Sequence, residues 1–532
     1  MSSHFESEQE KSATSGSKPE AEPSASPDGG DGEAQLAAGK PRLRARVHYA
    51  AYIGLALFLV LWDPFQWGEA SSKVSQDLTY RVLIGPLYPT EQRERISVVL
   101  FNEATLRYLG ATWPVALGRH AEILRNIREM APRAVMVDFI FPDKRDDPTV
   151  KQLQDEILAY QGTGIPLYFA RAEGTDLDWI RSDLSEARLT SIATPISDGV
   201  SRAYEPCSML PGDNRACACV AGPNEFEACP AGTDAGSPES PVALTAAFEL
   251  YRDQISLPDR LNIHKPGPME VVWSNRRNPI NAMWMRKKTA AGLEDLCVDI
   301  ASSVGDWLRR MVFKSEQHSF LQTCPYSTTV SARMLLSAPG DAALRDILHG
   351  RYVFYGADLT GLEDTVVPPT HVKLPGVYLH AMALDNLLTF KGDYKHSSIS
   401  VFGGDIGAEG LSLIVAVLLA LIVVAFARSE PVIRADRIST GKARGLTYFR
   451  ILWRRWRYWF LFNLCTFVVI VAVCWALYSW AGISPKNWLG YWGLMMALSG
   501  MAKGRLAEGV ATTIAERFVP RLEPIIFKEE RT

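Results

Sequence analysis

Apolar positions along this chain are concentrated in four continuous runs, at 50–62, 410–427, 458–480 and 488–501. The second run has 18 residues without a charge, which is long enough to cross a bilayer as a helix. The first run is shorter, but Trp62, Phe65 and Trp67 extend it with aromatic residues typical of membrane interfaces. We therefore predict four membrane helices, within 41–67, 401–427, 458–480 and 487–502. An amphipathic anchor is the alternative for the first run.

Basic residues set the expected orientation of these helices. The segment 428–457 is rich in arginine and lysine and separates the second run from the third. By the positive-inside rule this loop faces the cytoplasm, which puts 68–400 outside the membrane and both termini inside the cell. Residues 1–40 are acidic and poor in large apolar side chains, so we expect a disordered cytoplasmic tail. A docking arm for a cytoplasmic partner is the alternative, and 503–532 form a second cytoplasmic tail.

The segment between the first two runs has the pattern of a globular domain. Short runs of β-forming residues alternate with stretches in which apolar residues recur at helical spacing. Strands are predicted at 96–101, 134–141, 166–170, 269–273 and 352–355. Helices are predicted at 103–109, 150–160, 240–251, 300–313 and from 377 onward. Such alternation implies parallel crossover units, so the expected fold is an α/β domain with a mixed or parallel sheet and flanking helices.

Six of the eight cysteines lie in this same segment: Cys207, Cys217, Cys219, Cys229, Cys297 and Cys324. The first four belong to a stretch rich in proline and glycine, which indicates a surface insertion over 204–241. An even set confined to one segment favours disulfides in an oxidising compartment. Four clustered cysteines allow three pairings, and they lack the spacing of a structural metal site. Among all six, Cys297 with Cys324 is the preferred pair.

The most specific motif lies at 351–390. A strand ending in Gly356 is followed by a loop that contains glycine and aspartate. Pro-Gly-Val-x-x-His-Ala-x-Ala-x-Asp-x-Leu-Leu then begins at Pro375. This order resembles the C-terminal signature of the CHASE2 domain, an extracytoplasmic sensor module of bacterial signalling receptors.

Motifs nearer the N-terminus extend the resemblance over roughly 77–390. Asp77 and Arg81 match a juxtamembrane Asp-x-x-x-Arg helix, Trp-Pro stands at 113–114, and Arg-x-His-Ala begins at Arg119. The family often has an acidic residue where this chain has Asn102. The middle of the segment, including the cysteine-rich insertion, is not similar to the family in detail.

The resemblance implies a sensor. CHASE2 receptors share the layout of one span, the sensor domain and about three further spans, and they usually continue into a kinase or nucleotide-cyclase domain. No kinase, P-loop or hydrolase motif is present here. We therefore expect a non-enzymatic, multi-pass protein of the bacterial inner membrane that signals through a separate partner. A structural or assembly subunit of a cell-envelope complex is the main alternative, and an extracytoplasmic hydrolase is a third.

Candidate ligand-binding residues are the polar groups at the predicted strand ends: Glu103, Asp138, Asp143, Asp364 and His380. Ligands bind open α/β sheets beyond the carboxyl ends of the strands, where gathered carboxylates hold a cation or a polar molecule. The alternative is that these residues cap helices and tie down loops. Asp385 follows His380 by about one helical turn, a spacing that predicts an ion pair between them.

Partners follow from charge and layout. The net charge of -3 gives no strong attraction for nucleic acid. The expected partners are the lipid bilayer and a signalling or envelope protein, and a homo-oligomer is left open. No cofactor and no metal are expected.

Overall fold

The computed structural model describes residues 67–141, 146–171, 188–191, 200–206, 245–254, 269–284, 286–289, 292–295, 297, 323–362, 364–391, 394–395, 398–401, 404–407, 445–480, 482, 488–490, 492–493 and 496. The chain divides into two compact units, 1–56 and 57–532, and every described residue belongs to the second. Both predicted tails, nearly all of the first predicted span and most of the cysteine-rich insertion lie outside these residues, as does the predicted helix at 300–313.

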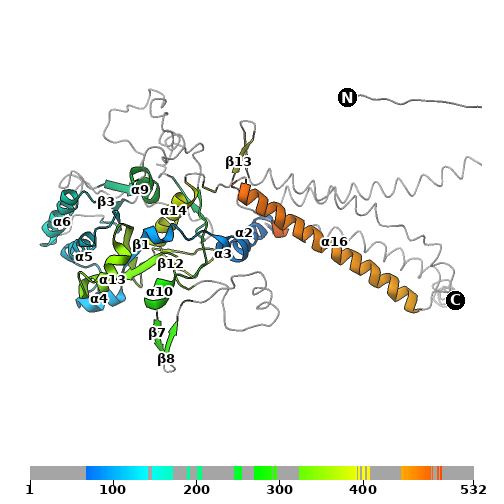
Figure 1. The fold of residues 1–532 in the computed structure, drawn as a ribbon, viewed down its shortest axis with the longest axis horizontal. Helices are drawn as coiled ribbons and strands as arrows, with labels where there is room; N and C mark the ends of the chain where they lie inside the picture. The colour runs from blue at the N-terminus through cyan, green and yellow to red at the C-terminus, as the bar shows by residue number, and fades with distance from the viewer. Residues whose placement is uncertain are drawn as a thin grey trace, which may run out of the picture. The chain divides into compact units, whose positions relative to one another are not determined.

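Six parallel strands form the central sheet, in the order β4-β3-β2-β10-β1-β9 (Figure 1). Their bounds are β1 Ile96–Asn102, β2 Ala134–Asp138, β3 Leu167–Arg171, β4 Arg188–Ser191, β9 Thr328–Ser331 and β10 Tyr352–Asp358. The predicted α/β class and the parallel sheet are therefore confirmed. The strand predicted at 134–141 is shorter than expected, because pairing with both neighbours has ended by Asp138.

β10 is the strand that joins the two halves of the sheet. It pairs with β1 on one side, with Asn102 opposite Asp358, and with β2 on the other, with Asp138 opposite Gly356. A strand made late in the chain thus lies between two strands made early. All six strands run in one direction, so their carboxyl ends share one edge of the sheet.

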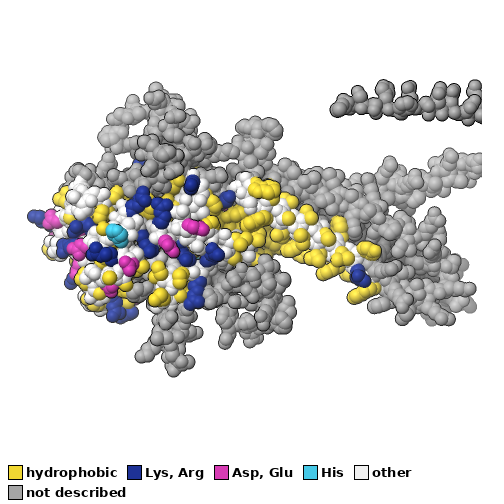
Figure 2. Space-filling view, viewed as in Figure 1, with side chains coloured by type: hydrophobic (Ala, Val, Ile, Leu, Met, Phe, Trp, Pro, Cys, Tyr) yellow, Lys and Arg dark blue, Asp and Glu magenta, His cyan; other side chains and the backbone are white. Residues whose placement is uncertain are grey.

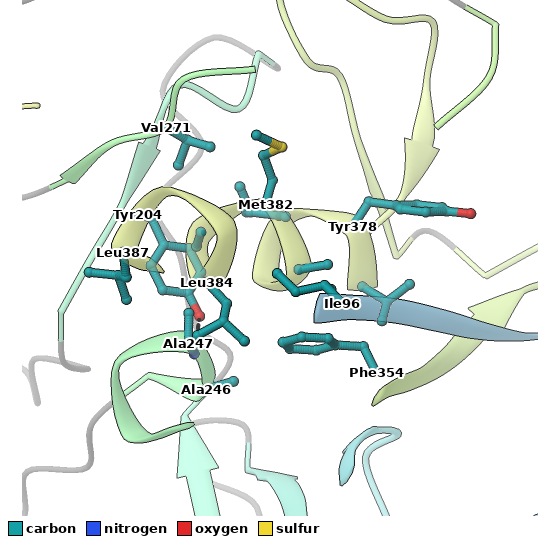
Figure 3. Close-up of a cluster of buried hydrophobic side chains, with 14 of the residues drawn as sticks. Ile96, Tyr204, Ala246, Ala247, Val271, Phe354, Tyr378, Met382, Leu384 and Leu387 are labelled. Atoms are coloured by element: carbon teal, nitrogen blue, oxygen red, sulfur yellow. Dashed lines mark hydrogen bonds between the residues drawn. The ribbon is translucent and has the colours of Figure 1, made fainter. Parts of the chain in front are cut away.

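Helices cover both faces of the sheet, as buried parallel strands require. On one face lie α14 Val377–Phe390 and α9 Ala246–Gln254; on the other lie α4 Glu103–Leu109, α5 Leu117–Glu129, α6 Val150–Thr163, α12 Ala332–Ser337 and α13 Ala342–Leu348. Successive strand residues alternate between these cores, so Phe354 packs with α14 while Tyr355 packs on the opposite face. Figure 3 shows Ile96 and Phe354 on the same side of α14 as Leu384.

Four short antiparallel strand pairs complete the described part of the domain: β5 Ala203–Tyr204 with β6 Met269–Glu270, β7 Arg286–Thr289 with β8 Gly292–Asp295, β11 Thr365–Val366 with β12 Leu374–Pro375, and the hairpin β13 Ser398–Val401 with β14 Gly404–Gly407. The strand predicted at 269–273 is thus only two residues long. The last hairpin takes the first residues of the predicted span 401–427. Glycine suits a tight turn and disfavours a helix interior, which explains why 404–407 are not helical.

A helical segment leads from the first predicted span into the sheet. It consists of α2 Trp67–Thr79, the π-helix η1 Tyr80–Ile84 and the short helix α3 Gly85–Leu87. Further along, a 3-10 turn, η2 Arg93–Arg95, precedes β1, and α10 Pro279–Trp284 precedes β7. π-helical turns are rare and occur frequently at functional sites.

Helix α16 Gly445–Trp480 contains a stretch, Trp456–Trp480, that is long and apolar enough to cross a membrane. It coincides with the third predicted span, and Figure 2 shows apolar side chains along this helix. The predicted basic loop 428–457 is helical from Gly445 and continues directly into this stretch. For the fourth predicted span, 488–490, 492–493 and 496 are helical. The second predicted span lies outside the described residues beyond 407.

Cys297 and Cys324 form a disulfide, with their Cα atoms 4.9 Å apart, and both are buried beside Ala282. This is the pair preferred from the sequence. The other four candidate cysteines, Cys207, Cys217, Cys219 and Cys229, lie outside the described residues.

Candidate functional site

The carboxyl edge of the sheet brings the ends of β2, β10 and β1 together. Asp138 is the last residue of β2, Asp358 the last of β10, and Asn102 the last of β1. The polypeptide then leaves the sheet in loops, so polar side chains at these ends are freed from strand pairing. This is the edge at which open α/β sheets bind ligands.

Asp138 faces His380, which lies in the first turn of α14. Asp138 Oδ1 is 3.9 Å from His380 Nε2, too far for a hydrogen bond but close enough for electrostatic interaction. On the other side of the ring, His380 Nδ1 is 2.7 Å from the hydroxyl of Tyr204. That hydroxyl accepts the amide N–H of Ala247, as Figure 3 shows, so its own proton is available for Nδ1. When that proton is donated to Nδ1, the ring proton lies on Nε2, toward Asp138.

Burial decides the charge state of this pair. Asp138 is 6% exposed, and burial raises its pKa to about 7. Burial lowers the pKa of His380 to about 4, although the nearby Asp364 opposes that shift. The imidazole is therefore neutral at pH 7, and Asp138 has no cationic neighbour among the described residues. Asp138 Oδ2 makes no hydrogen bond with any residue that the structure describes. A buried carboxylate oxygen without a partner is costly to folding.

Asp364 completes the cluster from the loop after β10. Its carboxylate lies so close to Gly376 that a Cβ added at residue 376 would overlap Asp364 Oδ1. The residue has a solvent-exposed edge, yet partial burial, with Asp138 nearby, raises its pKa to about 6. The structure thus brings together three of the five predicted site residues: Asp138, Asp364 and His380.

Glu103 makes its hydrogen bond outside this cluster. It is the first residue of α4, and its carboxylate accepts the amide N–H of Thr360 at 3.3 Å. Its charge, together with burial as the larger cause, raises the pKa of Asp358. Asn102 caps the same helix by accepting the amide N–H of Thr105, so helix capping explains this position. Asp143 lies outside the described residues.

Asp385 does not pair with His380, and that prediction is wrong. Its carboxylate accepts hydrogen bonds from the hydroxyls of Tyr88, at 2.6 Å, and Thr389, at 3.3 Å. Five residues at 100° each place the two side chains about 140° apart around the helix, so they point in different directions. Burial raises the pKa of Asp385 to about 7.

Tyr204 is the functional candidate that sequence reasoning missed. It belongs to a two-residue strand at the start of the predicted cysteine-rich insertion, where the chain has no family motif and no clear periodicity. Its fully buried hydroxyl fixes the His380 ring, a role that depends on tertiary contact alone. No local signal in the sequence could have paired it with a residue 176 positions away.

The Trp-Pro and Arg-x-His-Ala motifs meet on the opposite face of the sheet. His120 lies among the rings of Trp113, Phe139, Phe141 and Tyr355, and its Nδ1 is 3.0 Å from the Tyr355 hydroxyl. These motifs therefore build a buried aromatic core against the carboxyl edge. Among the described residues, no three His, Cys, Asp or Glu side chains are grouped to hold a metal ion.

The fold and this edge define an α/β domain of the kind that binds ligands at the carboxyl ends of parallel strands. A family model for the CHASE2 domain matches residues 52–422, so the chain belongs to the CHASE2 domain family. CHASE2 domains are extracellular sensor domains of membrane proteins. No curated protein and no solved structure matches the chain significantly.

Proposed function

We propose that this chain is a multi-pass inner-membrane sensor that detects a ligand or envelope state outside the cell and signals through a separate protein. The unpaired, buried Oδ2 of Asp138 carries the proposal, because it lies beside Asp364 and His380 at a ligand-binding edge. Strongly perturbed ionisable groups gathered in one place are more frequent at functional sites than elsewhere. The resemblance to sensor domains supports this assignment.

The loop 364–376 offers a route from this cluster to the membrane-proximal helix. Asp364 begins the loop, and Pro369 within it accepts a hydrogen bond from Arg81 Nε at 2.6 Å. Arg81 belongs to the π-helix, and the preceding turn is held by Asp77, whose carboxylate is 2.9 Å from Arg202. A ligand that moves Asp364 thus acts on a segment tied to the entry helix. It shifts the equilibrium only by its different affinity for the two arrangements.

Contacts near the predicted spans support transmission toward the membrane. Trp488 donates from Nε1 to Thr79 Oγ1 at 2.7 Å, which links the fourth predicted span to α2. Lys395 Nζ donates to the backbone carbonyl of Tyr478 at 3.0 Å, near the end of α16. The four-span topology with cytoplasmic termini is part of this proposal, and reporter fusions at Ser17 and Lys528 test it.

A partner that reads the sensor should respond to the state of the acidic cluster. We would cross-link and purify tagged wild-type protein from membranes and compare the captured proteins quantitatively with those of Asp138→Asn and Asp364→Asn. Asp346→Asn, an exposed change on α13, is the matched control. The proposal expects one partner whose capture changes in both cluster variants and not in the control. An unchanged, stoichiometric partner set would instead favour an envelope-assembly subunit.

A further inference from the structure

Among the residues that the structure describes, the acidic cluster has no lysine or arginine partner. No lysine or arginine contributes to the raised pKa values of Asp138 or Asp364, and neither residue forms an ion pair with one in the part of the chain that the structure describes. The single cationic candidate, His380, is held neutral by burial. Carboxylates that ionise in such a place are stabilised by a cation from outside.

Hydrogen bonding narrows the chemistry of that cation. An ionised carboxylate only accepts hydrogen bonds, and Asp138 Oδ2 has no donor within the described part of the chain. Nε2 of His380 lies 3.9 Å from the other oxygen, Oδ1. Asp364 supplies further acceptors with an edge open to solvent. A ligand group that fits these acceptors is compact, carries positive charge and has several N–H donors. A primary ammonium group meets this description, because it has three N–H donors.

We propose that Asp138 and Asp364 together bind the ammonium group of a small primary amine. This inference rests on the proposed sensor function and names the ligand class of the same site. The buried Asp138 Oδ2 accepts one ammonium N–H and the more exposed Asp364 accepts another. Asp138 gives up its proton on binding, because the ammonium charge stabilises the carboxylate. The released proton goes to the buffer.

Isothermal titration calorimetry on the full-length protein in nanodiscs tests this with putrescine as the probe. 1,4-Butanediol is the uncharged analogue of similar length. At pH 6.5, the proposal expects putrescine binding, no butanediol binding, and a heat that changes with the ionisation enthalpy of the buffer. Asp138→Asn and Asp364→Asn should each raise the Kd at least tenfold, while Asp346→Asn leaves it unchanged.

Gly376→Ala is a second variant that keeps both charges. The glycine has ordinary helical backbone angles, so alanine is tolerated there, but its Cβ displaces the Asp364 carboxylate. We expect weaker putrescine binding with the fold retained, as judged by circular dichroism. Equal putrescine affinity in Asp138→Asn and wild type would overturn the amine assignment. Binding of Ca²⁺ that depends on Asp138, without putrescine binding, would replace it with a metal site.

The two proposals fail in different ways. If putrescine does not bind but partner capture still changes in Asp138→Asn, the amine class is wrong and the sensor function stands. If putrescine does not bind and partner capture is the same in Asp138→Asn and wild type, both proposals are wrong and the cluster is structural.

Discussion

Arg81 of the π-helix donates a hydrogen bond to the carbonyl of Pro369, 288 positions later in the chain. The same residue's carbonyl accepts from Asn275 Nδ2 at 2.8 Å, so the π-helical turn is held from two directions. A π-helical turn has unusual backbone pairing, and outside contacts of this kind stabilise it. The π-helix and the loop 364–376 are therefore joined directly by a hydrogen bond.

Arg81→Gln should loosen that connection without disturbing the sheet. The shorter side chain cannot make the charge-assisted hydrogen bond to Pro369, which we expect to cost roughly 1–3 kcal/mol locally. Hydrogen–deuterium exchange should show faster exchange in 364–376 and unchanged protection in β1 and β10. Arg119→Gln, which removes an exposed ion pair with Glu122 on α5, is the control. Uniformly faster exchange across the sheet would show that the contact serves global stability instead.

Asp138→Asn should change how stability depends on pH. The folded pKa of about 7 exceeds the unfolded value of about 3.9, so the folded state holds its proton more tightly. That stabilisation is complete below about pH 4 and is lost as pH rises through 7. The variant stays neutral, so its advantage over wild type should grow from pH 4.5 to 7.5, reaching roughly 1–4 kcal/mol.

Thermal unfolding of both proteins in detergent across this range measures the difference. Asp385 titrates in both proteins, so its effect cancels, whereas the pKa of Asp364 is raised by Asp138 and its change belongs to the measured difference. Parallel curves for the two proteins would mean that Asp138 is not perturbed in the way that its burial requires.

Tyr204→Phe should destabilise the domain by roughly 1–3 kcal/mol, because it leaves two buried groups without partners. These are the amide of Ala247 and Nδ1 of His380. Chemical denaturation monitored by tryptophan fluorescence is the measurement, with Tyr108→Phe on exposed α4 surface as the control. In the double variant with His380→Phe the penalty of Tyr204→Phe should shrink, since one of the two unpaired groups is gone. Strict additivity would contradict the proposed hydrogen-bond chain.

Gly356→Ala should displace α14 from the sheet. A Cβ at residue 356 would lie 2.7 Å from the Cβ of Val377, so the helix must shift, at roughly 1–3 kcal/mol. The clashing atom is the Cβ of Val377, which only glycine removes, so adding Val377→Gly makes room and the double variant should lose less than the two single changes added together. Gly162→Ala in α6, where nothing lies within 4 Å, should be neutral or stabilising. Strictly additive losses in Gly356→Ala and Val377→Gly would place the strain elsewhere.

Periodicity predicted most of the α/β core. The helix at 103–109 was predicted with the bounds that the structure shows, because Asn102 caps it and Gly110 ends it in the left-handed region. The strand at 352–355 is real but longer, since pairing with β2 continues to Gly356 and pairing with β1 continues to Asp358. The strand predicted at 269–273 is only 269–270. An apolar run also suits a buried extended segment outside a sheet, and Val271 and Trp273 are buried in such a segment.

The site was predicted in part. Strand ends identified Asp138, and the loop after β10 identified Asp364, because carboxyl ends of parallel strands follow from the fold class. Local spacing misassigned Asp385, since its partner Tyr88 lies on a distant segment. The contribution of Tyr204 depends on contacts between segments that are far apart in the sequence, and hydrophobic patterning carries no information about them.

The position of β10 has a consequence for how the domain is made. During synthesis β1 emerges early, yet its only neighbours in the six-stranded sheet, β9 and β10, come near the end of the domain. Until then β1 and the open side of β2 present unpaired backbone groups, which invite pairing with other chains. The finished domain is closed by one late strand sliding between two early ones. A nascent chain halted before Tyr352 would lack β10, so the facing edges of β1 and β2 would have no partner strand between them.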